Sequence, residues 1–280
     1  MSRKRPRHAL LLLLGASGLL VVGALIGAVV LLSGVMTTAA TKQHFRATHR
    51  ILDLGLEYSV RAAADGITPP PLDDPFMRRQ GFACYRAHCE TCHGAPGVAP
   101  SPAALGMMPV PNNLSDSARA QDAAWLYYVT AKGVRMTGMP AWEYRMSERA
   151  LWSTVAFLRS LPATNAARYR ELTHEPPAAS CEPRIDLPPA DEPGEVLMLQ
   201  YGCHSCHIIE GVVGPQTHAA PPLVDWPRRA YIAGVLPNNQ DNLARWIMEP
   251  QVVSPQTAMP ALGVPAAHAR QMANYLFAQE

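Results

Sequence analysis

The chain has 280 residues, 48% of them hydrophobic, and a formal net charge of +2. That length leaves room for two domains of ordinary size beside an anchor. Subtracting the four Lys and Arg of the first eight residues from the total of 24 leaves 20, against 22 Asp and Glu. The remainder therefore lacks the basic excess that nucleic acid requires, and we expect no nucleic-acid partner.

A long apolar segment follows the basic tail 1–8. No charged residue occurs from Ala9 to Met36, a run of 28 residues. As a helix this run would be about 42 Å long, against a hydrocarbon core of about 30 Å. We therefore predict a transmembrane helix over 9–36. The alternative is a cleaved secretory signal, with small residues at Thr38–Ala40 to cut, but its apolar region usually spans only about 7–15 residues.

Basic residues before the apolar run keep the N-terminus in the cytoplasm. We therefore expect everything after Met36 on the periplasmic, extracytoplasmic side of a bacterial inner membrane. Residues 41–65 are mostly good helix formers and predict a helical stalk that continues the anchor and ends before Pro69–Pro71. A second proline-rich break predicts an inter-domain linker. The expected units after the anchor are a stalk with its linker at 37–73, a first domain at 74–162, a linker at 163–190 and a second domain at 191–280.

The two expected domains have the same internal order. Each opens with a helical pattern that runs into Cys-x-x-Cys-His, continues through a middle helix to Met-Pro, and closes with an apolar-periodic helix. The predicted helical segments are 74–92, 121–132 and 148–161 in the first domain, and 195–206, 242–249 and 266–278 in the second. Because no strand-like alternation competes, we predict an all-α fold made of a duplicated domain.

The Cys-x-x-Cys-His motif is the feature with the most specific chemistry. The thiols of Cys89 and Cys92 can add to the two vinyl groups of one haem, and the adjacent His93 then lies under the iron as its proximal ligand. A thiol redox pair would need a βαβ context, and a zinc site would need two further ligands at short spacing. The same three positions recur as Cys203, Cys206 and His207. The sequence therefore predicts two covalently bound haem c groups.

Two methionines are the candidates for the sixth iron ligand. Met139 lies 46 residues after His93, Met259 lies 52 residues after His207, and each is followed by proline. A thioether is a soft neutral ligand, so Met/His ligation raises the reduction potential. The alternative is that both are core filler, as most methionines are. The rivals, which we expect to be filler or surface residues, are Met107, Met108, Met136 and His218.

Other residues near the motifs have less specific roles. The backbone carbonyls of Pro100 and Pro215 are candidates to accept the Nδ1 hydrogen of the two proximal histidines, and the alternative is a simple turn. We expect His88 and His204, beside the haem cysteines, to face solvent or to pack.

Two cysteines remain after the haems take four. Cys84 lies in the first helix of its domain and Cys181 in the predicted linker. In an oxidising compartment an even remainder favours a disulfide. Free buried thiols are the alternative.

Taken together, these motifs resemble class I cytochromes c, with two domains in tandem over residues 74–162 and 191–280. Gly81 and Tyr85 stand 8 and 4 residues before Cys89, where that family packs its first helix against its last. The family's aromatic-plus-Leu pair of the final helix is matched within 155–158 and 273–276. The second domain departs from the pattern at Glu195 and Leu199, which puts its helix crossing in doubt.

Residues 133–142 and 231–239 also look like dihaem cytochromes c that accompany haem-copper terminal oxidases. This resemblance implies a membrane-anchored electron carrier of a respiratory chain. It would receive electrons from a soluble carrier and pass them to subunits of a terminal oxidase or another respiratory complex, without independent catalysis. The alternatives are the cytochrome subunit of a periplasmic dehydrogenase and a dihaem peroxidase.

Overall fold

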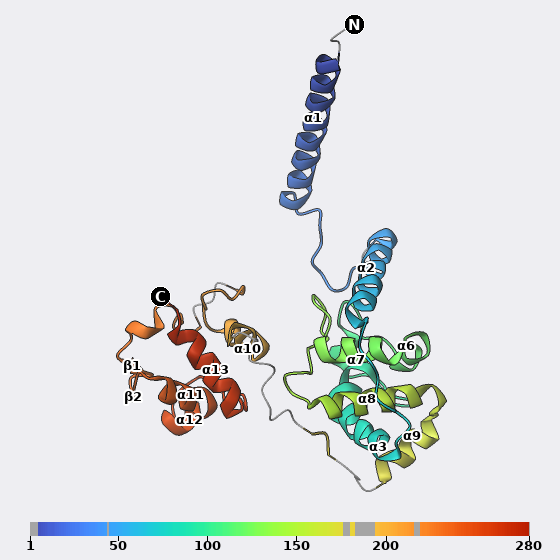
Figure 1. The fold of residues 1–280 in the computed structure, drawn as a ribbon, viewed down its shortest axis with the longest axis vertical. Coiled ribbons are helices and arrows are strands. Elements are labelled where there is room, and N and C mark those ends of the chain that lie inside the picture. The colour runs from blue at the N-terminus through green and yellow to red at the C-terminus, as the bar shows by residue number, and fades with distance from the viewer. Residues whose placement is uncertain (1–4, 44, 176–179, 183–193, 216–218, 280) are drawn as a thin grey trace.

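The computed structural model describes all of the chain except residues 1–4, 44, 176–179, 183–193, 216–218 and 280. The described part is mainly helical, as predicted, with one apolar helix near the N-terminus (Figure 1). The first part of the chain contains α1 (Arg5–Leu32), α2 (Arg46–Ala64), α3 (Pro75–Cys84), a π-helical turn (Tyr85–Cys89), α4 (Glu90–His93), α5 (Pro102–Leu105), α6 (Leu114–Ala120), α7 (Ala123–Lys132) and α8 (Glu148–Ser160).

After α8 come a 3-10 turn (Leu161–Ala163) and α9 (Ala166–His174). The C-terminal part contains α10 (Gly194–Gln200), 3-10 turns at Cys203–Ser205 and Trp226–Arg228, α11 (Gln240–Met248), α12 (Pro250–Val253) and α13 (Ala266–Phe277). It also contains an antiparallel hairpin of β1 (Tyr231–Ile232) and β2 (Leu236–Pro237), which the sequence did not predict. A strand of two residues is too short to show a period in the sequence.

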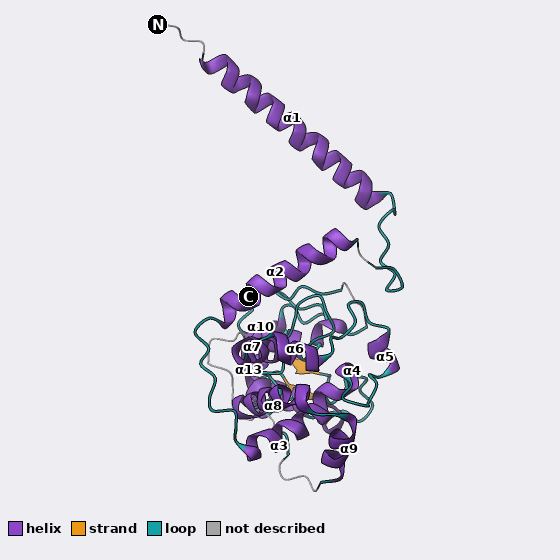
Figure 2. Cartoon of the chain, turned by 90° about the vertical axis from the view of Figure 1, so that its right-hand side faces the viewer, coloured by secondary structure: helices purple, strands orange, loops and turns teal. Residues whose placement is uncertain are grey.

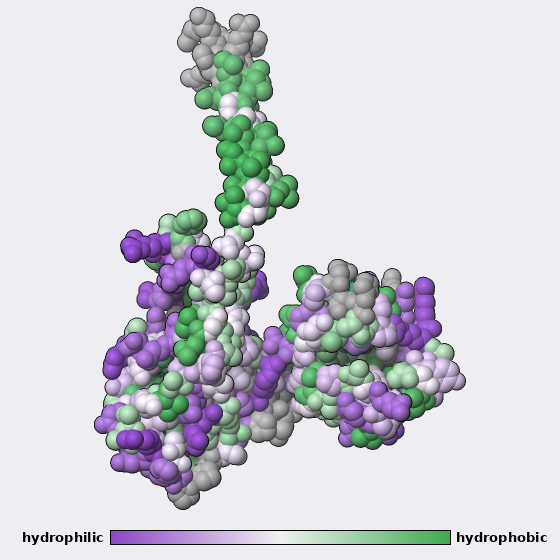
Figure 3. All heavy atoms as spheres, turned by 180° about the vertical axis from the view of Figure 1, so that it is seen from behind, coloured by the Kyte–Doolittle hydropathy of each residue, from purple (hydrophilic) through white to green (hydrophobic). Residues whose placement is uncertain are grey.

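The predicted anchor lies in α1. Its segment Leu10–Leu32 has a mean hydropathy of 2.5 and is long and apolar enough to cross a membrane. Apolar side chains cover the visible length of this segment (Figure 3). The expected continuous stalk is wrong, because the chain leaves the helix after Leu32 and α2 begins only at Arg46.

α2 is a separate helix that packs on the first domain. Its C-terminal half buries Val60 and Ala64. The Nε2 of Gln121, between α6 and α7, donates a hydrogen bond to Glu57 Oε2 at 3.1 Å. In two perpendicular views α2 projects from the side of this domain (Figures 1 and 2).

The first domain is built on the crossing of α3 and α8. A Cβ on Gly81 would lie 1.8 Å from the backbone carbonyl oxygen of Ser153, so only glycine allows the two helices to approach this closely. The ring of Tyr85 lies 5.2 Å from that of Phe157. These contacts are the ones that the cytochrome c resemblance implies for the first and last helices.

The predicted linker 163–190 begins with helix rather than irregular chain. Within α9, Tyr169 is fully buried and its ring lies 5.6 Å from that of Phe82 in α3. Because the packing partner is in the first domain, α9 covers that domain. Residues 176–179 and 183–190 of the predicted linker lie outside the described residues.

In the second part of the chain, α10 crosses α13 at a glycine that the sequence comparison passed over. A Cβ on Gly194 would lie 2.5 Å from the carbonyl oxygen of Gln271 and from Tyr275 Cβ. Gly194 precedes Cys203 by nine residues, whereas Gly81 precedes Cys89 by eight. The extra residue is absorbed where α10 ends, since Gly202 adopts a left-handed conformation before the 3-10 turn. The doubt about this crossing is thereby removed.

Candidate haem sites

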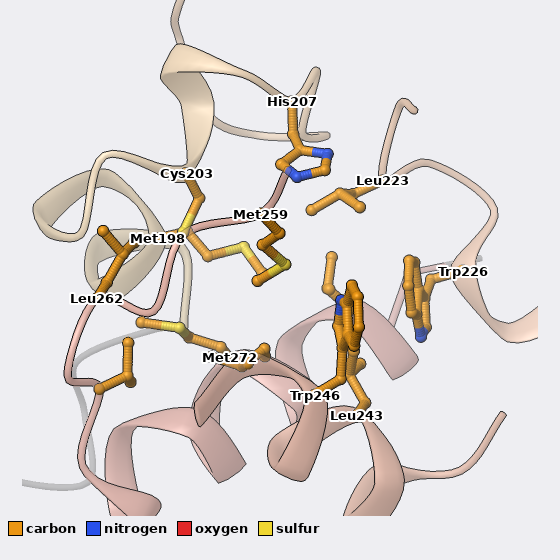
Figure 4. Close-up of a pocket in the computed structure, with 13 residues that line it drawn as sticks. Met198, Cys203, His207, Leu223, Trp226, Leu243, Trp246, Met259, Leu262 and Met272 are labelled. Carbon is orange, nitrogen blue, oxygen red and sulfur yellow. The ribbon is translucent and has the colours of Figure 1, made fainter. Parts of the chain in front are cut away.

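The second part of the chain contains an apolar pocket lined by three of the predicted haem residues. Cys203, His207 and Met259 share this pocket, which is partly open to solvent. Figure 4 shows the His207 ring and the Met259 side chain directed into it from different segments. Among the described residues that line the pocket there is no Asp, Glu, Lys or Arg.

The pocket suits a haem by the chemistry of its lining. Helices α11 and α13 supply an apolar floor that includes Leu243, Trp246 and Met272. The soft sulfur of Met259 and the imidazole of His207 are the two kinds of axial ligand that a cytochrome c iron takes, and Cys203 supplies a thiol for attachment. Cys206, the other predicted attachment residue, is exposed.

Both proximal histidine candidates are oriented by backbone carbonyls. The Nδ1 of His93 donates to the Asn112 carbonyl over 2.8 Å, and that of His207 donates to the Pro221 carbonyl over 2.7 Å. The second nitrogen, Nε2, is thus left to bind a metal. Burial lowers the pKa of His93 by more than the hydrogen bond to Asn112 raises it. The lowered pKa favours the neutral form of the ring, which is the form that binds a metal.

The prediction that Pro100 and Pro215 supply these carbonyls is wrong. Instead, Pro100 packs behind the motif, with its Cδ 3.0 Å from where a Cβ on Gly94 would be. Pro215 is exposed. The partners that the structure uses lie further along the chain because each motif is followed by a longer loop, so a fixed offset from the motif cannot find them.

In the first domain the motif lies on the π-helical turn and α4. Cys89 is buried, and Cys92 and His93 are partly exposed. Burial raises the pKa of Cys89 to about 12, and burial likewise raises the pKa of Cys203 to about 11.

The loop that carries Met139 depends on a glycine. Gly133 has a φ of +67°, and a Cβ there would lie 2.7 Å from the carbonyl oxygen of Met139. The backbone N–H of Met139 donates to Thr137 Oγ1 at 3.0 Å. Of the rival methionines, Met136 is 94% and Met108 40% exposed. Met107 is partly buried, with its sulfur against Gly138 in the same loop.

The Met259 loop is built in the same way. Its backbone N–H donates to Thr257 Oγ1 at 3.2 Å, and Gln251 Nε2 donates to its carbonyl at 2.5 Å. A threonine stands two residues before the methionine in both Met-Pro loops, and this repeat is a sequence signal for the shared loop structure. The rival His218 lies outside the described residues.

In each part of the chain a tyrosine hydroxyl donates a hydrogen bond to a backbone carbonyl just after the Cys-x-x-Cys-His motif. The tyrosine follows the first helix of the crossing in one case and lies on the last helix in the other. In the first domain Tyr85, just after α3, donates to the Gly94 carbonyl at 2.5 Å. In the second part Tyr275 on α13 donates to the Glu210 carbonyl, also at 2.5 Å. The hydroxyl of Tyr169 on α9 donates to the carboxylate of Glu90, inside the first motif.

The remaining two cysteines form the predicted disulfide. Cys84 and Cys181 are bonded, with 4.7 Å between their Cα atoms. Cys84 is fully buried beside Ala150 and Leu151 of α8. The backbone N–H of Ser147 donates to the Glu182 carbonyl at 3.2 Å, so the segment around Cys181 is held at the start of α8.

Arg145 connects the two parts of the chain that carry the candidate sites. Its Nη1 donates to the Ala141 carbonyl at 3.1 Å and its Nη2 to the Gln200 carbonyl at 2.6 Å, while its guanidinium lies 5.8 Å from the centre of the Tyr201 ring. Ala141 and Tyr144 are buried in the same apolar cluster as residues of α10 and α13. Burial lowers the pKa of His88, and the charge of Arg145 lowers it further.

Comparison with known proteins agrees with the first site. Residues 77–158 match the family model described as cytochrome c oxidase, cbb3-type, subunit III. A relative from Alkalihalophilus pseudofirmus, cytochrome c oxidase subunit 2, is 36% identical over 68 residues, which is 24% of this chain and 19% of that protein. The chain thus spans about a fifth of the length of this curated relative. No solved structure matches.

Residues 77–158 are therefore similar to a cytochrome c domain of the cbb3 type. This domain class implies covalently bound haem c. Together with the relative, it indicates a cytochrome c related to those of terminal oxidases.

Proposed function

We propose that this protein is a membrane-anchored dihaem cytochrome c that passes electrons along a respiratory chain to a haem-copper terminal oxidase. The observation that carries the proposal is the pocket shared by Cys203, His207 and Met259, in a chain whose first domain matches an oxidase cytochrome. Two tandem class I domains, at about 74–162 and 191–280, would each hold one haem.

A bound haem supplies an iron that takes up and releases one electron. The chain supplies its ligands and surroundings. In the first site Cys89 and Cys92 would attach the group, and His93 and Met139 would be the iron ligands. The same roles in the second site fall to Cys203, Cys206, His207 and Met259.

The protein groups around the second site favour a carrier. The thioether of Met259 and the uncharged lining both favour the ferrous form, which carries less charge, and so raise the potential. The carbonyl of Pro221 accepts a hydrogen bond from Nδ1 of His207 and would hold the ring in place on a bound haem. A peroxidase would need an open or displaceable ligand position, and a methionine aimed into the pocket argues against one.

The Arg145 contact supports transfer between the two sites within one chain. His88 precedes Cys89 directly, and its ring lies 4.8 Å from that of Trp142. Three residues further, Arg145 reaches Gln200 and Tyr201, which lie just before Cys203. The two motifs therefore approach one another through a few packed side chains.

The apolar helix α1 would hold both sites near one membrane face, on the extracytoplasmic side of a bacterial inner membrane. Confinement raises the effective concentration of the haems at a membrane partner. A soluble carrier would be the electron donor.

Affinity purification through a tag after Glu280, following extraction in mild detergent, tests the proposal. We expect haem-copper oxidase subunits to co-purify and oxygen uptake to follow addition of a reduced carrier. Recovery of the protein alone from the soluble fraction would contradict it. Co-purification with a dehydrogenase would instead favour the alternative, in which the protein is the cytochrome subunit of a periplasmic dehydrogenase.

A further inference from the structure

Helix α2 has an apolar face that is exposed rather than buried. Ile51, Leu54 and Tyr58 are 69%, 57% and 70% exposed. Their spacing of three and four residues places them on one side of the helix. Phe45, just before the helix begins, is 86% exposed. A continuous row of large exposed apolar side chains marks a surface that contacts something else.

A different side of α2, near its C-terminal end, is turned toward the first domain. Glu57 accepts the hydrogen bond from Gln121, and Val60 and Ala64 near it are buried. Glu57 lies about 100° from Tyr58 around the helix, and Ile51 and Leu54 share the Tyr58 face. A surface helix ordinarily turns its apolar stripe to the core and its charges to water. In α2 the buried Val60 and Ala64 follow this rule, but Ile51, Leu54 and Tyr58 form a second apolar face that is exposed.

We propose that the apolar face of α2 lies in the interfacial layer of the same bilayer that α1 crosses. This inference rests on the proposed anchor. Only residues 33–45 separate the end of α1 from the start of α2, and a connection of this length allows α2 to lie at the membrane surface. An amphipathic helix at such a surface buries its apolar face about 5–10 Å into the boundary between headgroups and acyl chains.

Charge complementarity supports lipid as the occupant. Residues 41–64 contain four basic side chains and two acidic ones, although the exported chain as a whole has fewer basic than acidic residues. The basic side chains are Lys42, Arg46, Arg50 and Arg61.

The consequence is a fixed orientation for the first haem site. Because α2 packs on α7 and is tied to Gln121, burial of its other face would hold the first domain against the membrane surface. The domain would then be presented to a membrane partner from one side, and not only kept nearby by a flexible tether.

The test uses the full chain, loaded with haem, in nanodiscs of phosphatidylcholine and phosphatidylglycerol. Single variants Ile51→Cys, Leu54→Cys and Tyr58→Cys carry a nitroxide label, and spin relaxation measures collision with oxygen, which enters lipid, and with a nickel chelate, which stays in water. Asp53→Cys is the matched control on the opposite side of α2, since the Asp53 side chain is 65% exposed. Leu20→Cys reports on the anchor itself.

We expect the oxygen-to-nickel collision ratio at positions 51, 54 and 58 to exceed that at position 53 several-fold. Ratios equal to the control, with a lipid-like ratio at position 20, would overturn the inference and leave the anchor standing. A water-like ratio at position 20 would refute the anchor and the inference together. Protection from both reagents only after a haem-copper oxidase is added would overturn lipid in favour of a protein occupant.

Discussion

The guanidinium of Arg145 donates a hydrogen bond from Nη2 to the backbone carbonyl of Gln200, with 2.6 Å between the two atoms. Arg145 follows the loop of Met139, one candidate iron ligand, and Gln200 ends the helix that leads into Cys203. One side chain thus joins the methionine loop of the first candidate site to the cysteine motif of the second.

Replacing Arg145→Ala should slow electron transfer between the two proposed haems several-fold. A hydrogen bond from a charged donor contributes about 1.5–3 kcal/mol, so its loss would reduce the population in which the two sites are in contact. Rapid photoreduction followed by optical detection of the two haems measures the rate. The control is Arg149→Ala, whose guanidinium lies 5.5 Å from the Phe76 ring and away from this contact. Equal rates in both variants would show that Arg145 has no part in the transfer.

The same variant should raise the pKa of His88. Burial is the larger cause of the lowered pKa of His88 and the charge of Arg145 the smaller, so the pKa should move toward its ordinary value without reaching it. Proton NMR of the reduced, diamagnetic protein measures the titration. An unchanged pKa in Arg145→Ala would mean that the guanidinium is not near His88 in solution.

The sign of the pH effect on stability follows from the same shift. Because the pKa of His88 is lower in the folded than in the unfolded protein, its contribution to stability is complete above the unfolded value of about 6.5. It is lost as the pH falls through the folded pKa. The wild-type protein should therefore lose more stability on acidification below about pH 6.5 than Arg145→Ala does, as chemical unfolding at several pH values would show.

Gly133→Ala should disturb the loop of Met139. The positive φ and the contact of 2.7 Å with the Met139 carbonyl leave no room for a Cβ, so the loop must shift. If Met139 is the ligand, the methionine–iron charge-transfer band of the first site should weaken or vanish. Gly106→Ala in the same domain is the control, because its Cβ would meet only atoms at 3.6 Å or more. A full band in Gly133→Ala would argue against ligation by Met139.

Cys181→Ser should lower the stability of the first domain by about 2–4 kcal/mol, because the bond closes a sequence separation of 97 residues. Urea unfolding followed by tryptophan fluorescence measures the change. Alkylation of the unreduced, denatured wild-type protein should label neither Cys84 nor Cys181. Labelling of both would show that the bond is not formed in the cell.

The sequence predicted the main helices of both expected domains because each has an apolar face, but it did not predict α5, α6, α9 and α12, which are short or lie in the predicted linker. It also pointed to the pocket residues Cys203, His207 and Met259, since the haem motif is local and Met-Pro repeats at similar spacing. The separate α2 was missed although the sequence carries a signal for the break: Ser33, Gly34 and the threonines at 37, 38 and 41 are poor helix formers.

Other features depend on tertiary packing and have no local signal. The backbone carbonyls of Asn112 and Pro221 accept hydrogen bonds from His93 and His207. Which carbonyl reaches each histidine depends on the length of the loop that follows the motif. Gly194 lies one residue further from its cysteine motif than Gly81 does, because the turn at the end of α10 holds an extra residue. The contact of Arg145 with Gln200 joins segments 55 residues apart, and neither residue type predicts it.

The central claim is that one chain carries two haems, each on its own cysteine pair. Mass spectrometry of the purified, denatured protein tests it most directly, since thioether-bound haem survives denaturation. We predict the mass of the chain plus two haem c groups, and a loss of one group in the double variant Cys203→Ala, Cys206→Ala. A wild-type mass with a single haem, unchanged in that double variant, would contradict the dihaem assignment and leave only the first site.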